Sequence, residues 1–212
     1  MSNNNQILKD KWVGYSAVYS TKELKINGFQ VMQSWEDDYM KQLARIATSK
    51  GGNVLEIGFG LGISASYIQQ APKLKSHTVI ECHPNVVCFA SKRFKDRIAL
   101  GKMVIMNGFW EDVVAKLKDN YFDGILFDSS PLNQETVFFH FTPFFKEAHR
   151  LLRGGGIFTY FSDEPKCISS GHMKKLKQAG FSKINYKVCE VSPPKDCRYW
   201  PYKTIIAPII YR

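Results

Sequence analysis

Short apolar runs alternate with helical segments along most of the chain, and this alternation limits the fold more than any other feature. The runs lie at residues 53–57, 77–81, 102–106, 122–127 and 156–160. Helical segments are expected between them at residues 63–70, 85–94, 111–117 and 135–152, and the Gly-Gly-Gly sequence at 154–156 should stop the last of these. Buried strands separated by helices are typical of a parallel sheet covered on both faces, so the sequence predicts an α/β fold.

The alternation changes near the C-terminus. A helix is expected at residues 172–178, followed by strands at 183–189 and 204–210 with no helix between them. The link between these strands holds three prolines and therefore is not helical throughout. Without a crossover helix, the two strands either pair as a hairpin or lie apart.

The region before the first buried strand divides into two parts. Residues 35–48 carry apolar side chains at positions 35, 39, 40, 43, 46 and 47, which is a helical stripe. Residues 1–31 are polar with interspersed Trp and Tyr. No internal repeat and no long linker divides the chain. We therefore expect one domain over residues 36–212 and an N-terminal flap over residues 1–35.

Charge is the unusual property of the composition. The net charge is +10, and residues 150–212 hold 12 Lys or Arg but only 4 Asp or Glu. A nucleic acid, an anionic membrane surface or an acidic ligand would suit such an excess, but a solvated, solubilising surface is the favoured interpretation. The basic C-terminal third alone does not identify a partner.

Targeting and redox features are few. No apolar run is long enough to span a membrane, and the first residues lack the apolar core of a secretory signal. The five cysteines are an odd number without the spacing of a zinc site. These features predict a cytoplasmic protein with reduced thiols, no metal site and no membrane contact.

A glycine-rich segment follows the first buried strand and opens a helix. It reads Glu56-Ile57-Gly58-Phe59-Gly60-Leu61-Gly62. Glycines let the chain turn tightly and let a ligand approach the main chain at the edge where open α/β sheets bind nucleotides. A dinucleotide loop would need its third glycine at Ile63, and the Gly-Lys-Ser/Thr of a P-loop is absent. The pattern resembles the first motif of S-adenosylmethionine-dependent methyltransferases, whose cofactor carries a sulfonium and an ammonium group.

Acidic residues follow other strands at the same edge. Glu81 ends the second strand, where a carboxylate accepts both hydroxyls of a ribose, and Asp128 ends the fourth. Trp110 and Glu111 follow the third strand and suit an adenine ring. The alternatives are a surface residue for Glu81, a turn for Asp128 and helix capping for the residues near Trp110.

Several blocks across the chain resemble the guanidinoacetate N-methyltransferase family. The more specific ones are Trp35-Glu36 with Tyr39-Met40, and Asp196-Cys197-Arg198-Tyr199 after Pro193-Pro194. Further blocks are Trp12 with Tyr19, residues 31–34, 49–60, 80–82, 110–113 and 122–126, and Asp128 with Pro131-Leu132. The resemblance implies a Rossmann-like class I methyltransferase fold: a mostly parallel seven-stranded sheet with an antiparallel C-terminal hairpin, and the flap folded over the cofactor.

The resemblance also implies roles for individual residues. Contacts with S-adenosylmethionine, which leaves as S-adenosylhomocysteine, are implied for Trp12, Met32, Met40, Gly58, Phe59, Gly60, Leu61, Gly62, Ile63, Glu81, Cys82, His83, Trp110, Glu111 and Asp128. Glu36 and Asp128 would hold the guanidine, and Asp128 would be nearest to the reacting nitrogen. A guanidinium is planar and cationic, so paired carboxylates match it, and one of them can take a proton as the methyl group moves. Without the resemblance, Glu36 reads as a solvated acid at a helix start.

The sequence departs from the family pattern after the strand that ends near residue 160. The family has an Asn-Leu-Thr-type stretch there, which receives the substrate carboxylate, whereas this chain reads Phe161-Ser162-Asp163-Glu164-Pro165. We expect Ser162 and Asp163 on the substrate side. Acids at this place would repel a carboxylate, which favours a guanidine with a neutral or cationic tail, such as agmatine, or arginine held by its ammonium group. The alternative is that Asp163 and Glu164 point to solvent.

Other functions stay open at this point. The Glu81–Pro84 block is also similar to protein arginine N-methyltransferases that act on a ribosomal or RNA-associated target, and a non-catalytic cofactor-binding protein is a third possibility. His83 and His140 are weaker candidates for a general base. The aromatic residues at 138–145 suit a helix face on the sheet better than a base-stacking platform. We expect a small guanidino compound as substrate, no nucleic acid, and a monomer or homodimer.

Overall fold

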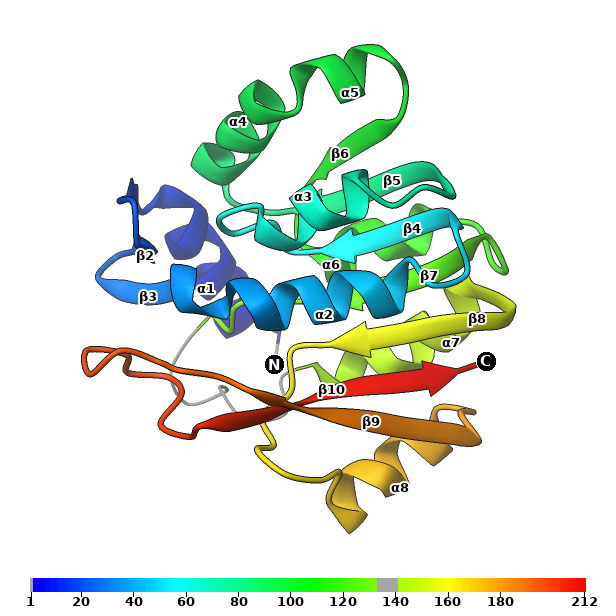
Figure 1. The fold of residues 1–212 in the computed structure, drawn as a ribbon. Helices are drawn as coiled ribbons and strands as arrows, with labels where there is room; N and C mark the ends of the chain where they lie inside the picture. The colour runs from blue at the N-terminus through cyan, green and yellow to red at the C-terminus, as the bar shows by residue number, and fades with distance from the viewer. Residues whose placement is uncertain (1, 133–140) are drawn as a thin grey trace.

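The centre of the structure, a computed structural model that describes residues 2–132 and 141–212, is a seven-stranded sheet. The strand order is β6-β5-β4-β7-β8-β10-β9 (Figure 1). Parallel pairing joins β4 (Gly52–Ile57), β5 (Leu74–Glu81), β6 (Met103–Asn107), β7 (Phe122–Phe127) and β8 (Leu152–Tyr160). The predicted α/β fold with a mostly parallel sheet is confirmed.

The last two strands form a hairpin at one edge of this sheet. β9 (Lys183–Glu190) pairs antiparallel with β10 (Thr204–Tyr211), and β10 also pairs antiparallel with β8. The hairpin is therefore confirmed over the alternative of separate strands.

The strand β8 begins earlier than expected: we predicted a start at Gly156, but Gly154 and Gly155 also lie inside it. The preceding helix α7 (Phe145–Leu151) ends directly before β8 begins. The glycines still find sheet partners: the N–H of Gly155 donates to the carbonyl of Arg212 at 2.8 Å. Because glycine has no side chain to disturb the pairing, the strand continues through them.

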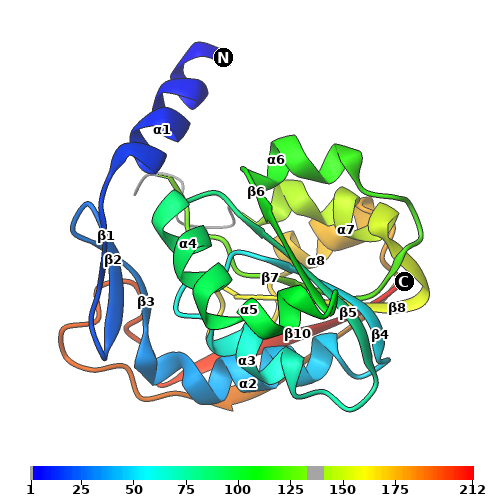
Figure 2. The same ribbon diagram turned by 90° about the horizontal axis from the view of Figure 1, so that it is seen from above.

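Helices cover both faces of the sheet (Figure 2). On one face α2 (Asp37–Ala47), α3 (Ile63–Gln69) and α4 (Pro84–Arg93) pack against the strands, and on the other α6 (Trp110–Val113), α7 and α8 (Ser170–Gln178) do so. Successive residues of β4 face opposite cores: Val54 packs in the cluster of α2, and Leu55 in the cluster of α7. The apolar runs in the sequence thus reflect strands that are buried on both sides.

Several helices differ in detail from the expectation. The segment expected at 35–48 is a 3-10 turn, η1 (Ser34–Glu36), followed by α2, and the one at 111–117 is α6 followed by η2 (Val114–Lys116). A short helix α5 (Lys95–Ala99) was not expected. Of the segment at 135–152, the described part begins with η4 (Thr142–Phe144) and α7; His140 and the phenylalanines at 138 and 139 lie outside the described residues.

The N-terminal region is more ordered than the sequence suggested. Helix α1 (Ser2–Gly14) precedes a three-stranded antiparallel sheet of β1 (Ala17–Tyr19), β2 (Glu23–Ile26) and β3 (Phe29–Gln33). This small sheet lies at the edge where the parallel strands end (Figure 1). Asn27 and Gly28 connect β2 to β3 with φ of 50° and 77°. Asn-Gly is the usual two-residue hairpin turn, so a signal for this sheet was present in the sequence.

Two observations concern the environment of the protein. None of the helices in the described part of the chain is both long and apolar enough to cross a membrane. All five cysteines are free thiols, and Cys82 is the one closest to the site described next.

Candidate active site

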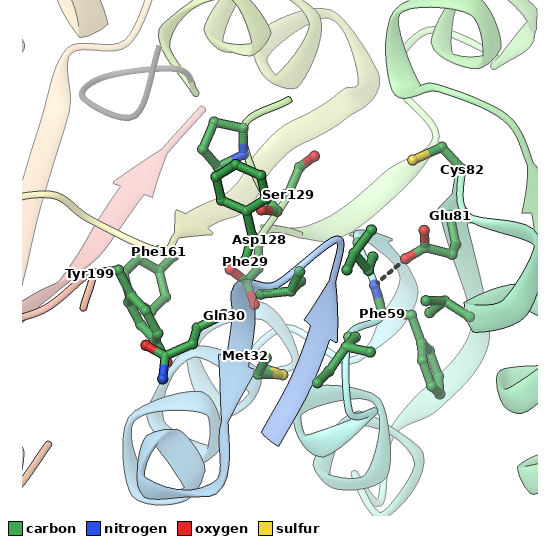
Figure 3. Close-up of a pocket in the computed structure, with 18 of the residues that line it drawn as sticks. Phe29, Gln30, Met32, Phe59, Glu81, Cys82, Asp128, Ser129, Phe161 and Tyr199 are labelled. Atoms are coloured by element: carbon green, nitrogen blue, oxygen red, sulfur yellow. Dashed lines mark hydrogen bonds between the residues drawn. The ribbon is translucent and has the colours of Figure 1, made fainter. Parts of the chain in front are cut away.

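A cavity of about 630 Å³ lies where the parallel strands end and the small N-terminal sheet covers them (Figure 3). This volume is within the range of about 300–1,000 Å³ that is typical of small-molecule sites. Among the residues that the sequence singled out, those that line it are Trp12, Met32, Glu36, Gly58, Phe59, Gly60, Glu81, Cys82, Trp110, Asp128 and Asp163. The structure therefore brings together residues from the flap, the glycine segment and four strand ends.

The glycine segment forms one wall of the cavity. Gly58 has a φ of 84°, and a Cβ atom at this position would lie 2.0 Å from the carbonyl oxygen of Asp128. Only glycine lets the first turn after β4 pass this close to the end of β7. The Sδ atom of Met32 lies 3.2 Å from the N–H of Leu61, so the flap rests directly on this loop.

Glu81 is buried at the end of β5, and both of its carboxylate oxygens are held by main-chain groups. Oε2 accepts a hydrogen bond from the N–H of Phe59 at 3.0 Å, and Oε1 accepts one from the N–H of His83 at 2.8 Å (Figure 3). Burial raises the pKa of Glu81, and the main-chain hydrogen bonds partly oppose that rise. Each oxygen keeps a further lone pair for a ligand hydroxyl.

Glu56, the acidic residue at the start of the glycine-rich segment, does not line the cavity. Its side chain is fully buried below the glycine segment, where the hydroxyl of Ser64 donates to Oε1 and the Nε2 of His77 lies 2.9 Å from Oε2. The reason is the alternation of β4: Glu56 points into the protein, where Ser64 and His77 lie beside its carboxylate. Glu56 is a structural residue at the base of the loop.

Glu36 enters the cavity from the other side, at the end of η1. Its Oε1 accepts hydrogen bonds from the N–H of Gln33 at 2.8 Å and from the hydroxyl of Tyr199 at 2.5 Å. The side chain is 2% exposed, and burial raises its pKa to about 7 while these two hydrogen bonds oppose the rise. Glu36 is therefore a fixed carboxyl group that changes its charge near neutral pH.

Asp128 follows β7 and stands near the middle of the cavity (Figure 3). Within the described part of the chain, no hydrogen-bond donor reaches its carboxylate. Burial is the main cause that raises its pKa well above the usual range, and the nearby charges of Glu36, Glu56 and Glu81 add to it. A bound cation would stabilise the ionised form of this carboxyl group, because the cation offsets both the burial and the repulsion by the neighbouring acids.

Aromatic and apolar side chains build the wall between Glu81 and the flap. Trp110 lines the cavity and packs edge-on against Phe127 at 5.9 Å and Phe144 at 5.4 Å between ring centroids. Trp12 reaches this wall from α1 and is 6% exposed. The flap is fixed here by Lys9, whose Nζ lies 2.9 Å from the Oδ2 of Asp112. The result is an apolar slot with a carboxylate at one end.

The stretch after β8 is divided between the cavity and the protein interior. Asp163 lines the cavity, but Ser162 is fully buried, and its N–H donates to the hydroxyl of Tyr39 at 3.3 Å. Glu164 is 6% exposed and its Oε2 lies 2.9 Å from the Nδ1 of His172, which in turn is 2.6 Å from the hydroxyl of Tyr160. Glu164 thus faces neither the ligand nor solvent, because this buried group holds it.

Some of the residues that the resemblance assigned to the cofactor do not line the cavity. Met40 belongs to α2 and is fully buried in the core, and Leu61, Gly62 and Ile63 are not among the residues that line the cavity. Two more residues lie at the interface with the flap: the Nε2 of His83 is 3.0 Å from the carbonyl of Tyr15, and Glu111 is 3.9 Å from the Nζ of Lys9. Their contribution to a cofactor site remains a prediction.

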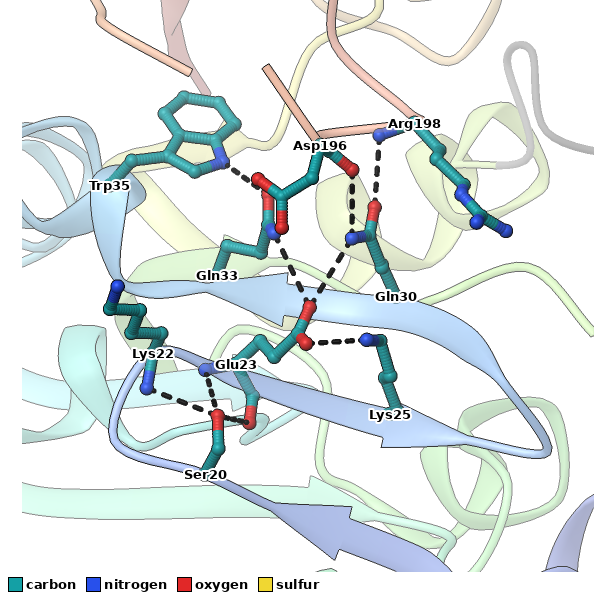
Figure 4. A network of polar contacts seen from close by, with 9 residues as sticks. All are labelled: Ser20, Lys22, Glu23, Lys25, Gln30, Gln33, Trp35, Asp196 and Arg198. Carbon is teal, nitrogen blue, oxygen red and sulfur yellow. Dashed lines mark hydrogen bonds and ion pairs between the residues drawn. The ribbon is translucent and has the colours of Figure 1, made fainter. Parts of the chain in front are cut away.

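Other residues of the cavity were not expected from the sequence. Most come from the small sheet and from the link between β9 and β10: Leu24, Ile26, Phe29, Gln30, Val31, Arg198, Tyr199 and Trp200. Gln30 joins the two segments (Figure 4): its Nε2 donates to the carbonyl of Asp196 at 3.0 Å, and its Oε1 accepts from the N–H of Arg198 at 2.9 Å. Sequence patterns do not show contacts between segments more than 160 residues apart.

Comparison with known proteins agrees with this architecture. The sequence model of the guanidinoacetate N-methyltransferase family matches residues 2–212. Protein arginine N-methyltransferase 2 of Yarrowia lipolytica is 32% identical over 141 residues, covering 62% of this chain and 28% of that protein. The protein of the same name from Candida glabrata is 33% identical over 150 residues, covering 65% and 34%. The chain thus matches about a third of the length of these relatives.

Solved structures share the fold at low sequence identity. A spermidine synthase from Thermotoga maritima superposes with a TM-score of 0.68 at 15% identity, covering 92% of this chain and 72% of that one. An O-methyltransferase from Bacillus cereus in complex with SAH gives a TM-score of 0.56 at 14% identity, covering 84% and 82%. These two likenesses concern the Rossmann-like sheet and its helices.

Proposed function

The chain belongs to the guanidinoacetate N-methyltransferase family, is an S-adenosylmethionine-dependent methyltransferase, and, we propose, methylates the guanidino group of a small molecule. The observation that carries the proposal is the meeting of Glu36 and Asp128 in one cavity. They come from opposite sides of it, Glu36 from the end of η1 and Asp128 from the end of β7. Both carboxyl groups have a raised pKa, which is typical of functional sites and suits two acids whose charge a bound cation would stabilise.

The residues at the other end of the cavity fit the cofactor. Gly58 and Gly60 make room where a Cβ atom would collide with Asp128 or Met32, and Glu81 presents a carboxylate for ribose hydroxyls. Trp12 and Trp110 flank the apolar slot, which suits the adenine. When bound, S-adenosylmethionine supplies an activated methyl group on a sulfonium.

Asp128 accepts the proton in the proposed mechanism. A guanidinium ion is a poor nucleophile because it is protonated and its lone pairs are delocalised. Asp128 takes a proton from the reacting nitrogen, and its raised pKa makes it a stronger base than an ordinary aspartate. Glu36 accepts hydrogen bonds from the nitrogens that do not react and keeps the positive charge on them.

Tyr199 orients the second carboxylate. Its hydroxyl donates to Glu36, and its ring stacks on Trp35 with 6.0 Å between centroids. The ring contact fixes the hydroxyl, and the hydroxyl together with the N–H of Gln33 fixes one oxygen of Glu36. The substrate is thereby aligned before reaction, so less entropy is lost in reaching the transition state.

A panel of guanidines tests the proposal. The protein is incubated with labelled S-adenosylmethionine and guanidinoacetate, arginine or agmatine, and the products are examined by mass spectrometry. We expect one methyl group on the guanidine of at least one compound, and its loss in Glu36→Gln. Asp38→Asn, which removes an exposed acid from the start of the next helix, serves as the control. Failure to methylate any guanidine would reject the proposed reaction.

A protein substrate is the second candidate. It is favoured by the relatives named protein arginine N-methyltransferase 2 and by the excess of basic residues after residue 149. The same two carboxylates would then hold an arginine side chain. Labelled cofactor incubated with a ribosomal fraction distinguishes the two: label in protein, with none in the small guanidines, would favour this candidate.

A further inference from the structure

Lysine and arginine side chains gather at the edge of the central sheet that lies opposite the cavity. Each strand of the sheet has one there, close to its start or, for β10, directly after its end. In the order of the strands across the sheet, these residues are Lys102, Lys73, Lys50, Lys118, Arg153, Arg212 and Lys183. We call these seven residues the basic edge. In Figure 1 the C-terminus marks this edge of the sheet, and the small N-terminal sheet marks the opposite one.

The sheet topology brings these residues together. The parallel strands all begin at the same edge. The pairing of Tyr211 with Ile157 puts the end of β10 beside the start of β8, and Lys183 at the start of β9 pairs with Tyr211. The sequence did not show this row of cations, because its members are spread over positions 50–212.

The basic edge keeps most of its positive charge. Six of the seven side chains are exposed, and Arg212 is half-buried. Within the described part of the chain, only Arg153 among them forms an ion pair, with 3.4 Å between its Nη1 and the Oδ1 of Asp123. Arg212 donates to neutral oxygens, a side-chain amide and a main-chain carbonyl. Asp119, which lies near the row, is paired with Arg150.

The cavity has the opposite charge and lies apart from the basic edge. The six residues of β4 separate the two edges of the sheet by about 20 Å. The charged residues that line the cavity are four acids and one base: Glu36, Glu81, Asp128, Asp163 and Arg198. The net charge of +10 is therefore placed unevenly, and the cation-binding reaction at the cavity does not use the basic edge.

The length of the row and its aromatic rings suit an extended polyanion that carries bases. Seven neighbouring strands spread the cations over about 29 Å. The Nζ atoms of Lys50 and Lys183 lie 5.7 Å and 4.6 Å from the ring centroid of Tyr211. Arg153 lies 5.9 Å from the ring centroid of Tyr121, which is 38% exposed. A nucleic-acid strand offers phosphates to the cations and bases to an exposed ring, whereas an acidic peptide offers only charge.

We propose that the basic edge binds the backbone of a single-stranded nucleic acid and that Tyr121 stacks on one of its bases. The binding is independent of base sequence, because the lysines contact phosphates and not base edges. The expectation of no nucleic acid came from sequence motifs, and the placement of charge in the fold leads to the opposite inference. This inference goes beyond the proposed function and does not depend on it.

The salt dependence of binding tests the proposal. A labelled single-stranded RNA of mixed sequence, long enough to span the row, is titrated with the full-length protein, and its fluorescence anisotropy is measured at several salt concentrations. One variant combines Lys50→Gln, Lys73→Gln and Lys118→Gln, which lie at the starts of three neighbouring strands. If each lysine contacts one phosphate, the slope of the logarithm of the association constant against the logarithm of the salt concentration should become shallower by about 2. The affinity at low salt should fall about tenfold or more.

A matched variant removes the same charge from the opposite edge. Lys22→Gln, Lys195→Gln and Lys203→Gln replace three exposed lysines of the flap and of the link between β9 and β10. Its slope and its affinity for RNA should stay close to those of the parent protein. An equal change in both triple variants would show that net charge attracts the RNA, and it would overturn the proposal.

A change of the ring separates a nucleic acid from other polyanions. Tyr121→Leu should weaken RNA binding about fivefold or more with an unchanged slope, because stacking releases no counterions. Polyglutamate and vesicles that contain phosphatidylserine are titrated under the same conditions and should bind more weakly than RNA. If either binds as tightly as RNA, or if Tyr121→Leu binds RNA as the parent does, the nucleic-acid assignment is rejected.

Enzyme assays keep this inference distinct from the proposed function. Methyl transfer to a small guanidine should be the same in the parent and in the triple variant of the basic edge, because the cavity is about 20 Å away. Failure of the parent to bind RNA even at low salt would reject the role of the basic edge and leave guanidine methylation untouched.

Discussion

The two halves of the cavity are built in different ways. On one side the glycine segment, Glu81 and Asp128 stand on the ends of adjacent parallel strands, and main-chain hydrogen bonds set their positions. On the other side the flap and the link between β9 and β10 meet through side chains such as Gln30 and Tyr199. The strand-end half depends on the central sheet, whereas the flap half combines polar contacts between distant segments with buried apolar side chains such as Trp12, Leu24 and Ile26.

This difference has a functional meaning. In the proposed function, the strand-end half binds the cofactor and supplies the proton acceptor. In the flap half, Glu36 is the carboxylate that the proposed function assigns to the substrate. A change at an exposed position of the flap half can alter substrate preference without disturbing the central sheet, because exposed side chains do not take part in the core.

The largest expected effect comes from the strand-end half. Asp128→Asn removes the proton acceptor but keeps the size of the side chain, and it should lower kcat by a factor of about 100 to 10,000. Binding of S-adenosylhomocysteine should persist, because Glu81 and the glycine segment are unchanged. The turnover is measured by the release of S-adenosylhomocysteine, and the affinity for S-adenosylhomocysteine is measured by calorimetry. An undiminished kcat would show that Asp128 is not the base.

The pH dependence tests whether the two acids act together. Glu36 and Asp128 have raised pKa values and must lose their protons to hold a cation, so kcat/KM should rise with pH through about 7 and then level.

The stability of the folded protein should change with pH in the opposite direction. Between pH 4.5 and about 7 the folded protein binds more protons at Glu36 than the unfolded chain does, so unfolding free energy falls as pH rises. A Tm that increases over this interval and is unaffected by Glu36→Gln would contradict this.

A pair of glycine variants compares the two halves directly. Gly58→Ala places a Cβ atom 2.0 Å from the Asp128 carbonyl at a φ of 84°, and should cost about 3 kcal/mol or more of unfolding free energy. Gly28 has a similar φ of 77° with nothing within 4 Å of the added atom, so Gly28→Ala should cost only about 1 kcal/mol. Equal losses in urea unfolding would show that the flap is packed as tightly as the strand ends.

The smallest effect is expected for the contact between α1 and α6. Lys9→Gln removes the ion pair with Asp112 and the cation–π contact with the ring of Phe109 at 4.8 Å. Because Asp112 is mostly exposed, the loss should be about 0.5–1 kcal/mol. Cofactor affinity should weaken by no more than a few-fold. Lys11→Gln, on the exposed side of α1, is the matched control. An equal loss of unfolding free energy in that variant would show that the change in net charge, and not the contact of Lys9, is responsible.

Sequence patterns predicted the central sheet well because its strands are buried on both faces. Runs such as residues 122–127 matched a strand at both ends, and the glycine segment lay where the strand and helix patterns placed it. The hairpin of β2 and β3 was missed because its strands are short and only half of their side chains are buried. Its Asn27-Gly28 turn was the available signal.

The candidate site was predictable where it follows the strand ends. The positions of Glu81 and Asp128 follow from parallel strands, which bring their C-terminal ends to one edge. The placement of Glu36 came from the family resemblance, since its local pattern suggests a solvated acid. Arg198 and Gln30 were not assigned a role, because their meeting depends on the path of the whole chain.

The sequence by itself determined the architecture: the order of strands and helices, the glycine turn and the acids at the strand ends follow from local periodicity and from residues with special conformations. Only the tertiary structure decided which acids face the ligand. Glu56 and Glu164 each lie 2.9 Å from a ring nitrogen of a buried histidine inside the protein, while Asp128 finds no donor among the described residues and Asp163 reaches the cavity wall. The physical reason is that the cost of a buried charge depends on the partners that distant segments bring to it, and local sequence does not contain those partners.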